Sequence, residues 1–213
     1  MSHLAENKFC KLRNLRNESD VEQNFLVRLL DDLGFTEDFR ETKSTLRPLP
    51  IDKGKRRRTY VPDYICYLDR AHKFPVLLVD AKPPDGNALE GVFDSQLYAS
   101  VLRRKLVEPK PEQFCMGSTS LATVVCHYDS DTVRHDLSFE DFDDGNPKFE
   151  VLRDELNRKS HANKLAPSNV FIFQKPDVRE IRALFEACHD VIWKREFESP
   201  VPAFLGILQV DVY

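Results

Sequence analysis

The first clear feature of the hydrophobic pattern is an amphipathic segment near the amino terminus. Apolar side chains recur every three or four residues from Val21 to Leu33, and Gly34 follows the last of them. This spacing predicts a helix with one apolar face that ends at the glycine. A short strand is predicted after it, from about Phe39 to Leu46.

The stretch from Val61 to Pro84, VPDYICYLDRAHKFPVLLVDAKPP, contains two apolar runs separated by a polar loop. Both runs are typical of strands. Because apolar residues lie on both sides of their charged residues, both favour positions inside a sheet rather than at its edge. The segment before them, Arg47 to Thr59, combines proline and glycine with several basic residues and is predicted to be a loop.

The remaining pattern continues the alternation of helices and strands. Asn146 is expected to cap the third helix, with Pro147 at its first position. An acidic, turn-rich segment is expected at 138–147 and a polar loop at 160–168. The remaining helices are predicted at about Phe93–Leu106, Pro147–Arg158 and Asp177–Lys194, and the remaining strands at Gln113–Met116 and Leu121–Tyr128.

This order of elements predicts an α/β fold. We expect a mixed central β-sheet flanked by helices in the order αβββαβ, because helices and strands alternate over most of the chain. The prediction is one α/β domain at residues 1–160 and a C-terminal helical extension at residues 161–213.

Composition agrees with a globular protein. Of the 213 residues, 41% are hydrophobic and 31% are charged. No apolar run approaches the roughly 18 residues that cross a membrane. The amino terminus lacks a signal-peptide pattern and the five cysteines lack zinc spacing, so we expect a cytoplasmic protein with reduced thiols and no membrane contact. The net charge of −4 excludes a wholly basic surface but permits a local basic patch.

Charged residues occur at one end of the two central strand candidates. If the runs pair as a regular antiparallel hairpin centred between Ala71 and His72, residues whose numbers sum to 143 lie opposite each other. Asp63 then faces Asp80. Lys82 points to the same face as Asp80, because side chains alternate along a strand. Regular pairing therefore brings three charged groups together.

Two carboxylates about 5 Å apart repel each other unless a proton or a cation lies between them. Mg²⁺ or Mn²⁺ with oxygen ligands removes this repulsion, and a lysine beside the ion can hold water or stabilise charge on a phosphate. The pattern favours phosphodiester hydrolysis. The alternatives are a chance Asp-x-Lys triplet and charges that discourage aggregation at an edge strand.

Three motifs in this order, VPDYICYL, PVLLVDAKPP and DSQLYAS, resemble the PD-(D/E)xK nuclease superfamily. Together they resemble most closely the N-terminal nuclease domain of type I restriction enzyme restriction (R) subunits, over about Ser19 to Leu156. The resemblance implies a restriction-endonuclease-like core and a divalent-metal-dependent DNA endonuclease of a restriction–modification system, with double-stranded DNA as its substrate.

The same resemblance implies roles for individual residues. Asp63 and Asp80 are the metal-binding carboxylates, and the backbone carbonyl of Ala81 is a further ligand of Mg²⁺ or Mn²⁺. Lys82 is the catalytic lysine, which orients or activates the attacking water. Glu22, on the first helix, reaches the metal directly or through water.

Two features of the helices leave alternatives open. Ser19 and Glu22 match a helix capping box, which explains Glu22 without a role in catalysis. Asp94 stands four residues before Tyr98, where the restriction family usually has glutamine, and an ionised carboxylate there would repel phosphate. This departure argues against a conventional role of the helix in DNA contact and leaves an altered or less active site open. Gln96 and Tyr98 are the candidates for DNA contact on this helix, and Tyr98 suits a core position equally well.

A basic segment precedes the strand that carries Asp63. Lys55, Arg56, Arg57 and Arg58 are candidates for contact with the DNA backbone, because neutralisation of phosphate dominates nucleic-acid affinity. A solvated turn is the alternative.

The sequence LFEACHDVIWKREFESPVPAF in the last predicted helix resembles the N-terminal helical segment of adenine-specific DNA methyltransferase subunits. This implies methyltransferase, specificity or motor subunits or domains as partners, and an ordinary core helix is the alternative. Two functional alternatives also remain. One is a catalytically weakened nuclease fold that binds DNA or docks a subunit, and the other is a nuclease for RNA or for branched or damaged DNA.

Overall fold

The computed structural model describes residues 5–53, 56–106 and 110–165, which fall within the unit Met1–Ser168. The helix predicted at Asp177–Lys194, and the predicted extension from residue 166 onwards, lie outside the described residues.

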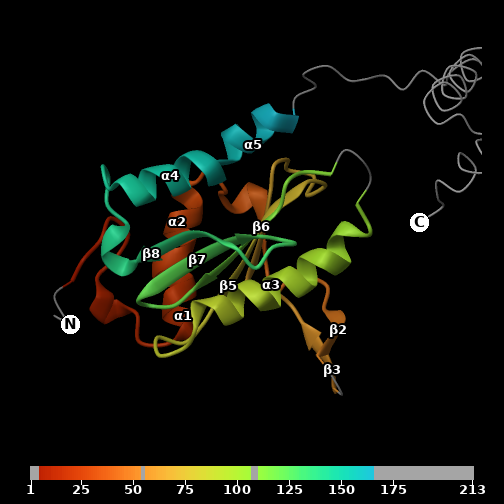
Figure 1. Cartoon of the computed structure of the whole chain (residues 1–213), viewed down its shortest axis with the longest axis horizontal. Helices are drawn as coiled ribbons and strands as arrows, with labels where there is room; N and C mark the ends of the chain where they lie inside the picture. Colours follow the sequence, from red (N-terminus) through yellow and green to blue (C-terminus); the bar gives the residue numbers. More distant parts are fainter. Residues whose placement is uncertain (1–4, 54–55, 107–109, 166–213) are drawn as a thin grey trace, which may run out of the picture. The chain divides into compact units, whose positions relative to one another are not determined.

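A six-stranded mixed sheet forms the centre of this unit (Figure 1). Its strand order is β1-β4-β5-β6-β7-β8. Neighbouring β5 and β6 run parallel and are connected through helix α3, whereas the other neighbouring pairs are antiparallel. The strands are β1 (Arg40–Thr42), β4 (Tyr64–Tyr67), β5 (Pro75–Ala81), β6 (Phe114–Ser118), β7 (Ala122–His127) and β8 (Val133–Ser138). The predicted mixed α/β sheet with flanking helices is confirmed.

In the described part of the chain, helical segments come before, between and after the strands. The predicted Asn146 cap is confirmed, because its side chain accepts a hydrogen bond from the amide of Lys148. The segments are η1 (Leu12–Asn14), α1 (Glu18–Asp20), η2 (Val21–Leu26), α2 (Val27–Asp32), η3 (Glu37–Phe39), α3 (Ala88–Arg103), η4 (Phe139–Asp141), α4 (Pro147–Leu156) and α5 (Arg158–Leu165).

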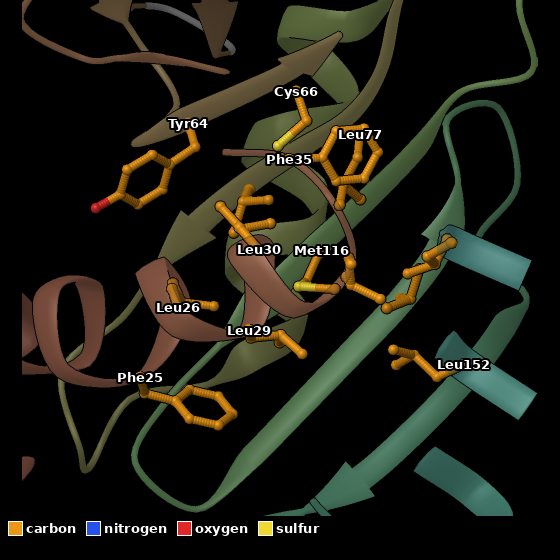
Figure 2. Packing of buried hydrophobic residues seen from close by; sticks show 14 of the residues in the cluster. Phe25, Leu26, Leu29, Leu30, Phe35, Tyr64, Cys66, Leu77, Met116 and Leu152 are labelled. Atoms are coloured by element: carbon orange, nitrogen blue, oxygen red, sulfur yellow. The ribbon is translucent and has the colours of Figure 1, made fainter. Parts of the chain in front are cut away.

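Each face of the sheet has its own apolar cluster. Figure 2 shows Phe25, Leu29 and Leu30 of the N-terminal helix gathered with Leu77 of β5 and Leu152 of α4 on one face. Helix α3 covers the opposite face, where it buries a second set of strand side chains. Strands β4 and β5 are consequently buried along their whole lengths, as their apolar runs predict.

The predicted register of the β4–β5 hairpin is confirmed. Tyr64 pairs with Val79, and Cys66 pairs with Leu77, so the paired residue numbers sum to 143. A bulge at Cys66/Tyr67 shifts the register only toward the turn. The end of the hairpin that leads to Asp63 keeps the regular pairing.

Three predictions of local structure are wrong. The loop expected at Arg47–Thr59 is largely a separate antiparallel hairpin, β2 (Leu49–Lys53) and β3 (Arg56–Tyr60), in which Lys53 pairs with Arg56. Pro50 lies inside β2, and proline is tolerated in an edge strand, so its presence does not exclude a strand here. Helix α3 begins at Ala88 rather than Phe93. Strand β8, most of which lies between the predicted strand Leu121–Tyr128 and the turn-rich segment 138–147, is absent from the prediction.

Helix α5 replaces most of the loop expected at 160–168. It has little amphipathic pattern. At its start the Asn157 side chain accepts a hydrogen bond from the amide of Lys159, and hydrogen bonds to distant residues explain the position of the helix. The guanidinium of Arg158 donates to the carbonyls of Gly34 and Leu68. Tertiary contacts of this kind leave no periodic signal in the sequence.

Two glycines allow α3 to approach the sheet closely. A Cβ atom on Gly117 of β6 would lie 1.8 Å from the carbonyl oxygen of Ala88, and one on Gly91 of α3 would lie 2.9 Å from the carbonyl oxygen of Asp80. These distances are too short for any side chain. The absence of two side chains therefore sets the position of α3 beside Asp80.

We predict that Gly117→Ala costs about 3 kcal/mol or more, because the added methyl group forces α3 away from the sheet. Denaturant unfolding of the full chain measures this loss. Gly145→Ala is the control. Its added Cβ meets nothing within 4 Å, and the positive φ of 85° predicts a loss of only about 1 kcal/mol. Equal losses in the two variants would contradict the close packing of α3.

Candidate active site

Regular strand pairing aligns three charged residues across the sheet. Tyr64 pairs with Thr42 on one side and with Val79 on the other. At the next position across the sheet, Lys43, Asp63 and Asp80 lie side by side. The amide of Lys43 donates to the carbonyl of Asp63 at 2.9 Å, which continues the pairing past the end of β1. The ends of three neighbouring strands therefore form the site.

Asp80 lies among polar partners although its residue is only 5% exposed. The Tyr60 hydroxyl donates to Asp80 Oδ1 at 2.7 Å, and Lys82 Nζ lies 2.7 Å from Asp80 Oδ2. Lys82 also donates to Asp94 Oδ2 at 3.0 Å, from α3. The predicted pair Asp80 and Lys82 is thus in direct contact, and Asp94 holds the lysine from the other side.

Asp63 is equally buried and has its own set of partners. Its Oδ2 atom accepts a hydrogen bond from the amide of Ala81 at 2.7 Å, and its Oδ1 atom accepts one from Lys43 Nζ at 3.0 Å. In an extended strand the amide and carbonyl of one residue point to the same edge. The Ala81 carbonyl therefore lies on the side of β5 that faces Asp63, which suits the predicted ligand role.

Glu22 joins the same group through Lys43, which donates to Glu22 Oε1 at 2.6 Å. The predicted capping box of Ser19 and Glu22 is wrong. The helix begins two residues earlier than that box requires, with Asn17 as its cap, and the Asn17 side chain accepts from the amide of Asp20. Glu22 lies in the π-helical segment η2, a kind of segment that is frequent at functional sites.

Burial and mutual repulsion shift the proton affinities of these acids. Burial raises the pKa of Asp80 to about 6, and the charge of Asp63 adds to this increase, while Lys82 and Tyr60 oppose it. Burial also raises the pKa of Glu22, again with a contribution from Asp63. Burial alone lowers the pKa of Lys82, but its contacts with Asp80 and Asp94 outweigh this effect and raise it.

The donor set suits a hard divalent cation. Carboxylate oxygens of Glu18, Glu22 and Asp63 lie within 4.8 Å of one another, which is close enough to share an ion. Oxygen ligands alone favour Mg²⁺ or Mn²⁺ over zinc. Asp80 is not a member of this compact group, although its carboxylate feels the charge of Asp63. Asp63 therefore stands between two acidic neighbours, Glu22 and Asp80.

Gln96 and Tyr98 make their hydrogen bonds elsewhere, although the Tyr98 ring packs edge-on against the ring of Tyr60. The Gln96 amide donates to the carbonyls of His127 and Ser130, and the Tyr98 hydroxyl donates to the carbonyl of Arg47. Both residues are buried. These contacts favour packing roles for both side chains, and for Tyr98 they agree with the alternative of a core position.

The basic segment leads directly into the site. Lys55 lies outside the described residues, and Arg56, Arg57 and Arg58 belong to β3. This strand ends at Tyr60, the residue that donates to Asp80. Figure 1 shows the β2–β3 hairpin extending away from the main sheet. The chain therefore places a basic arm only two residues from a contact of Asp80.

Comparison with known proteins gives no relative from which a role can be taken. No family model, no curated protein and no solved structure matches the chain.

Among the described helices, none combines the length and the apolar character that crossing a membrane requires. The four described cysteines, Cys10, Cys66, Cys115 and Cys126, are buried free thiols, which confirms the expectation for this part of the chain.

Sequence reasoning missed Lys43, Tyr60 and Glu18. Lys43 carried no signal of its own, because the pairing of β1 with β4 that puts it opposite Asp63 is known only from the structure. Tyr60 could not be placed while its segment was interpreted as a loop. Glu18 comes near Asp63 only in the folded structure, so the sequence alone did not single it out.

We predict that Tyr60→Phe lowers the free energy of unfolding by about 2 kcal/mol, because a buried carboxylate loses a charge-assisted hydrogen bond. Tyr67→Phe is the matched control. The Tyr67 hydroxyl donates at 2.5 Å to Glu41, whose side chain is 29% exposed, so water can replace the lost donor and about 1 kcal/mol or less is lost. Urea unfolding distinguishes the two results, and a smaller loss for Tyr60→Phe would contradict the prediction.

Proposed function

We propose that this chain is a Mg²⁺- or Mn²⁺-dependent endonuclease domain of the PD-(D/E)xK kind that hydrolyses phosphodiester bonds in DNA. The observation that carries the proposal is the convergence of Asp63, Asp80 and Lys82 at the ends of β4 and β5. Buried acids on central strands are costly to keep. A role in holding a cation and a phosphate gives this arrangement a function.

The order of elements supports the same proposal. A helix, the strands β1, β4 and β5, helix α3 and strand β6 follow one another in the main sheet, with the hairpin β2–β3 inserted after β1. This is the αβββαβ order of a restriction-endonuclease-like core. The site lies where β4 begins and β5 ends, as the motif resemblance implies.

In this proposal Asp63, Asp80 and the Ala81 carbonyl hold the cation, and Glu22 supports them. A bound Mg²⁺ or Mn²⁺ supplies Lewis-acid activation of the phosphate and of a water molecule. Lys82, kept as an ammonium by its two carboxylate neighbours, donates hydrogen bonds that orient the attacking water or stabilise negative charge on the phosphate. In-line attack by this water forms a new P–O bond as the bond to the leaving oxygen breaks, while the water gives up a proton to solvent and the leaving oxygen takes one up from solvent.

The proposed substrate is double-stranded DNA, with the basic segment before Tyr60 contacting the phosphate backbone. Methyltransferase, specificity and motor subunits or domains of a restriction system are the proposed partners. Comparing plasmid DNA with single-stranded DNA, branched DNA and RNA separates this substrate from the alternatives. Cleavage confined to RNA or to branched DNA would replace restriction with a repair or RNA-processing function.

We predict that calorimetry with Mn²⁺ at neutral pH detects one saturable site in the full chain, and that Asp63→Asn and Asp80→Asn each abolish binding because they remove ligand charge. Asp144→Asn, at a side chain that is 67% exposed, should bind like the wild type. Binding unaffected by either site variant would mean that these acids serve the fold or a partner.

We also predict that Lys82→Met keeps Mn²⁺ binding but lowers the rate of plasmid nicking about 100-fold or more, because a donor to the developing phosphate charge is lost. The measurement is single-turnover cleavage with Mn²⁺. Loss of metal binding in Lys82→Met would instead assign the lysine a role in keeping Asp80 in place.

One observation favours the alternative of a weakened nuclease that binds DNA or docks a subunit. Lys82 is shared between Asp80 and Asp94, and Asp94 occupies the position where the family usually has glutamine. The additional carboxylate restrains the lysine and repels phosphate.

If the chain is an enzyme slowed in this way, Asp94→Gln should raise the cleavage rate about tenfold, because one negative charge leaves the site. Asp85→Gln is the matched control at an exposed position before α3. No cleavage by either variant, with DNA binding retained in an anisotropy titration, would favour the binding-module alternative.

A further inference from the structure

Lys43 is the residue on which the acidic side of the site depends. Its Nζ atom lies 2.6 Å from Glu22 Oε1 and 3.0 Å from Asp63 Oδ1. The two acidic side chains are only 7% and 6% exposed, whereas the Lys43 side chain is 50% exposed. One end of this lysine therefore lies between two buried acids while much of the side chain remains in contact with solvent.

The position of the ammonium coincides with the place that a cation needs. Glu22 and Asp63 share Lys43 Nζ, and Glu18 offers a third oxygen within 4.8 Å of theirs. A divalent ion bound to the same oxygens would lie about 2.0–2.6 Å from them. An ammonium and a metal ion cannot both occupy the space between two oxygens that are already shared at hydrogen-bonding distance.

We propose that Lys43 is a built-in counter-ion that is exchanged for the divalent cation. In the metal-free protein it neutralises Glu22 and Asp63, and it withdraws into solvent when Mg²⁺ or Mn²⁺ binds to them. The inference rests on the proposed metal site, in the form in which Glu22 reaches the cation directly, and adds to it a residue that sets the affinity of that site. Lys43 is a positioning residue, because it acts through the acids that would hold the metal.

Two physical arguments support an exchange rather than a permanent ion pair. A half-exposed lysine regains hydration when it leaves, so withdrawal does not leave a buried charge unpaired. A divalent ion also brings twice the charge of an ammonium to oxygens that repel one another. By contrast, Lys82 is 18% exposed and lies between two acids with small exposed fractions, so the same exchange at Asp80 would be more costly.

The test is Mn²⁺ calorimetry on the full-length chain with wild type, Lys43→Met and Lys43→Arg. Lys43→Met removes the competing charge and keeps an apolar side chain of similar length. It should bind Mn²⁺ about tenfold more tightly or more, because no charge-assisted hydrogen bonds are broken on binding. Lys43→Arg keeps the charge and should bind no more tightly than the wild type.

Lys73→Met is the matched control, because Lys73 is exposed in the turn at the opposite end of the β4–β5 hairpin. It removes the same charge from the same pair of strands and should leave Mn²⁺ affinity within about twofold of the wild type, since a distant exposed charge is screened. Adding Asp63→Asn to Lys43→Met should abolish the tighter binding, which locates the gain at this site.

The outcomes separate the exchange from the proposed function. Wild-type binding that requires Asp63, with equal or weaker binding by Lys43→Met, overturns the exchange and leaves the metal site standing. Binding by neither protein overturns the metal site and the exchange with it. If Lys43→Met and Lys73→Met both bind Mn²⁺ more tightly, the change in net charge alone explains the gain in affinity. This result also overturns the exchange.

A second measurement does not need a stable Lys43→Met protein. With lysine side chains labelled with ¹³C, the Cε signal of Lys43 is assigned as the one lost in Lys43→Arg. Addition of Mg²⁺ should move this signal to the position of a solvent-exposed lysine over the same concentrations that saturate the site. A signal that stays in place at saturating Mg²⁺ overturns the exchange.

Discussion

Burial of acidic side chains at the ends of two central strands is the constraint on which this structure depends. Glu22, Asp63 and Asp80 are each only 5% exposed, and such charges are tolerated inside a protein only when they are paired. Three separate parts of the chain supply the partners: the end of β1, the end of β3, and the end of β5 with Lys82 directly after it. The electrostatic requirement thus explains why elements that are distant in sequence meet at one point.

The central part of this arrangement could be predicted from the sequence. The apolar runs of β4 and β5 are long and unbroken, and their short connection fixes the register, so the positions of Asp63 and Asp80 follow from counting residues. The single bulge lies toward the turn, where it does not disturb the charged end. The proposed roles of these residues come from the motif resemblance.

Other parts could not be predicted because their stabilising contacts are tertiary. Only His135 and Leu137 of β8 are buried, and His135 pairs with Glu155 of α4 at 2.6 Å, so this edge strand has little apolar signal. Helix α5 is fixed by hydrogen bonds from Arg158. Lys43 gave no pattern of its own, since its importance depends on how two other elements bring Glu22 and Asp63 together.

The π-helical turn in the first helix sets the angle, measured about the helix axis, between the side chains at its two ends. Leu29 and Leu30 fix the later half against the sheet, whereas Glu18 and Glu22 lie at the earlier end. Removal of one residue from this turn would restore regular α-helical geometry, and the earlier end would rotate by about 100° relative to the later one. Both glutamates would then point away from Asp63, and Val21, which is fully buried at the same end of the helix, would turn out of the core with them. The length of this one turn therefore decides whether a single helix can serve the core and the acidic site at the same time.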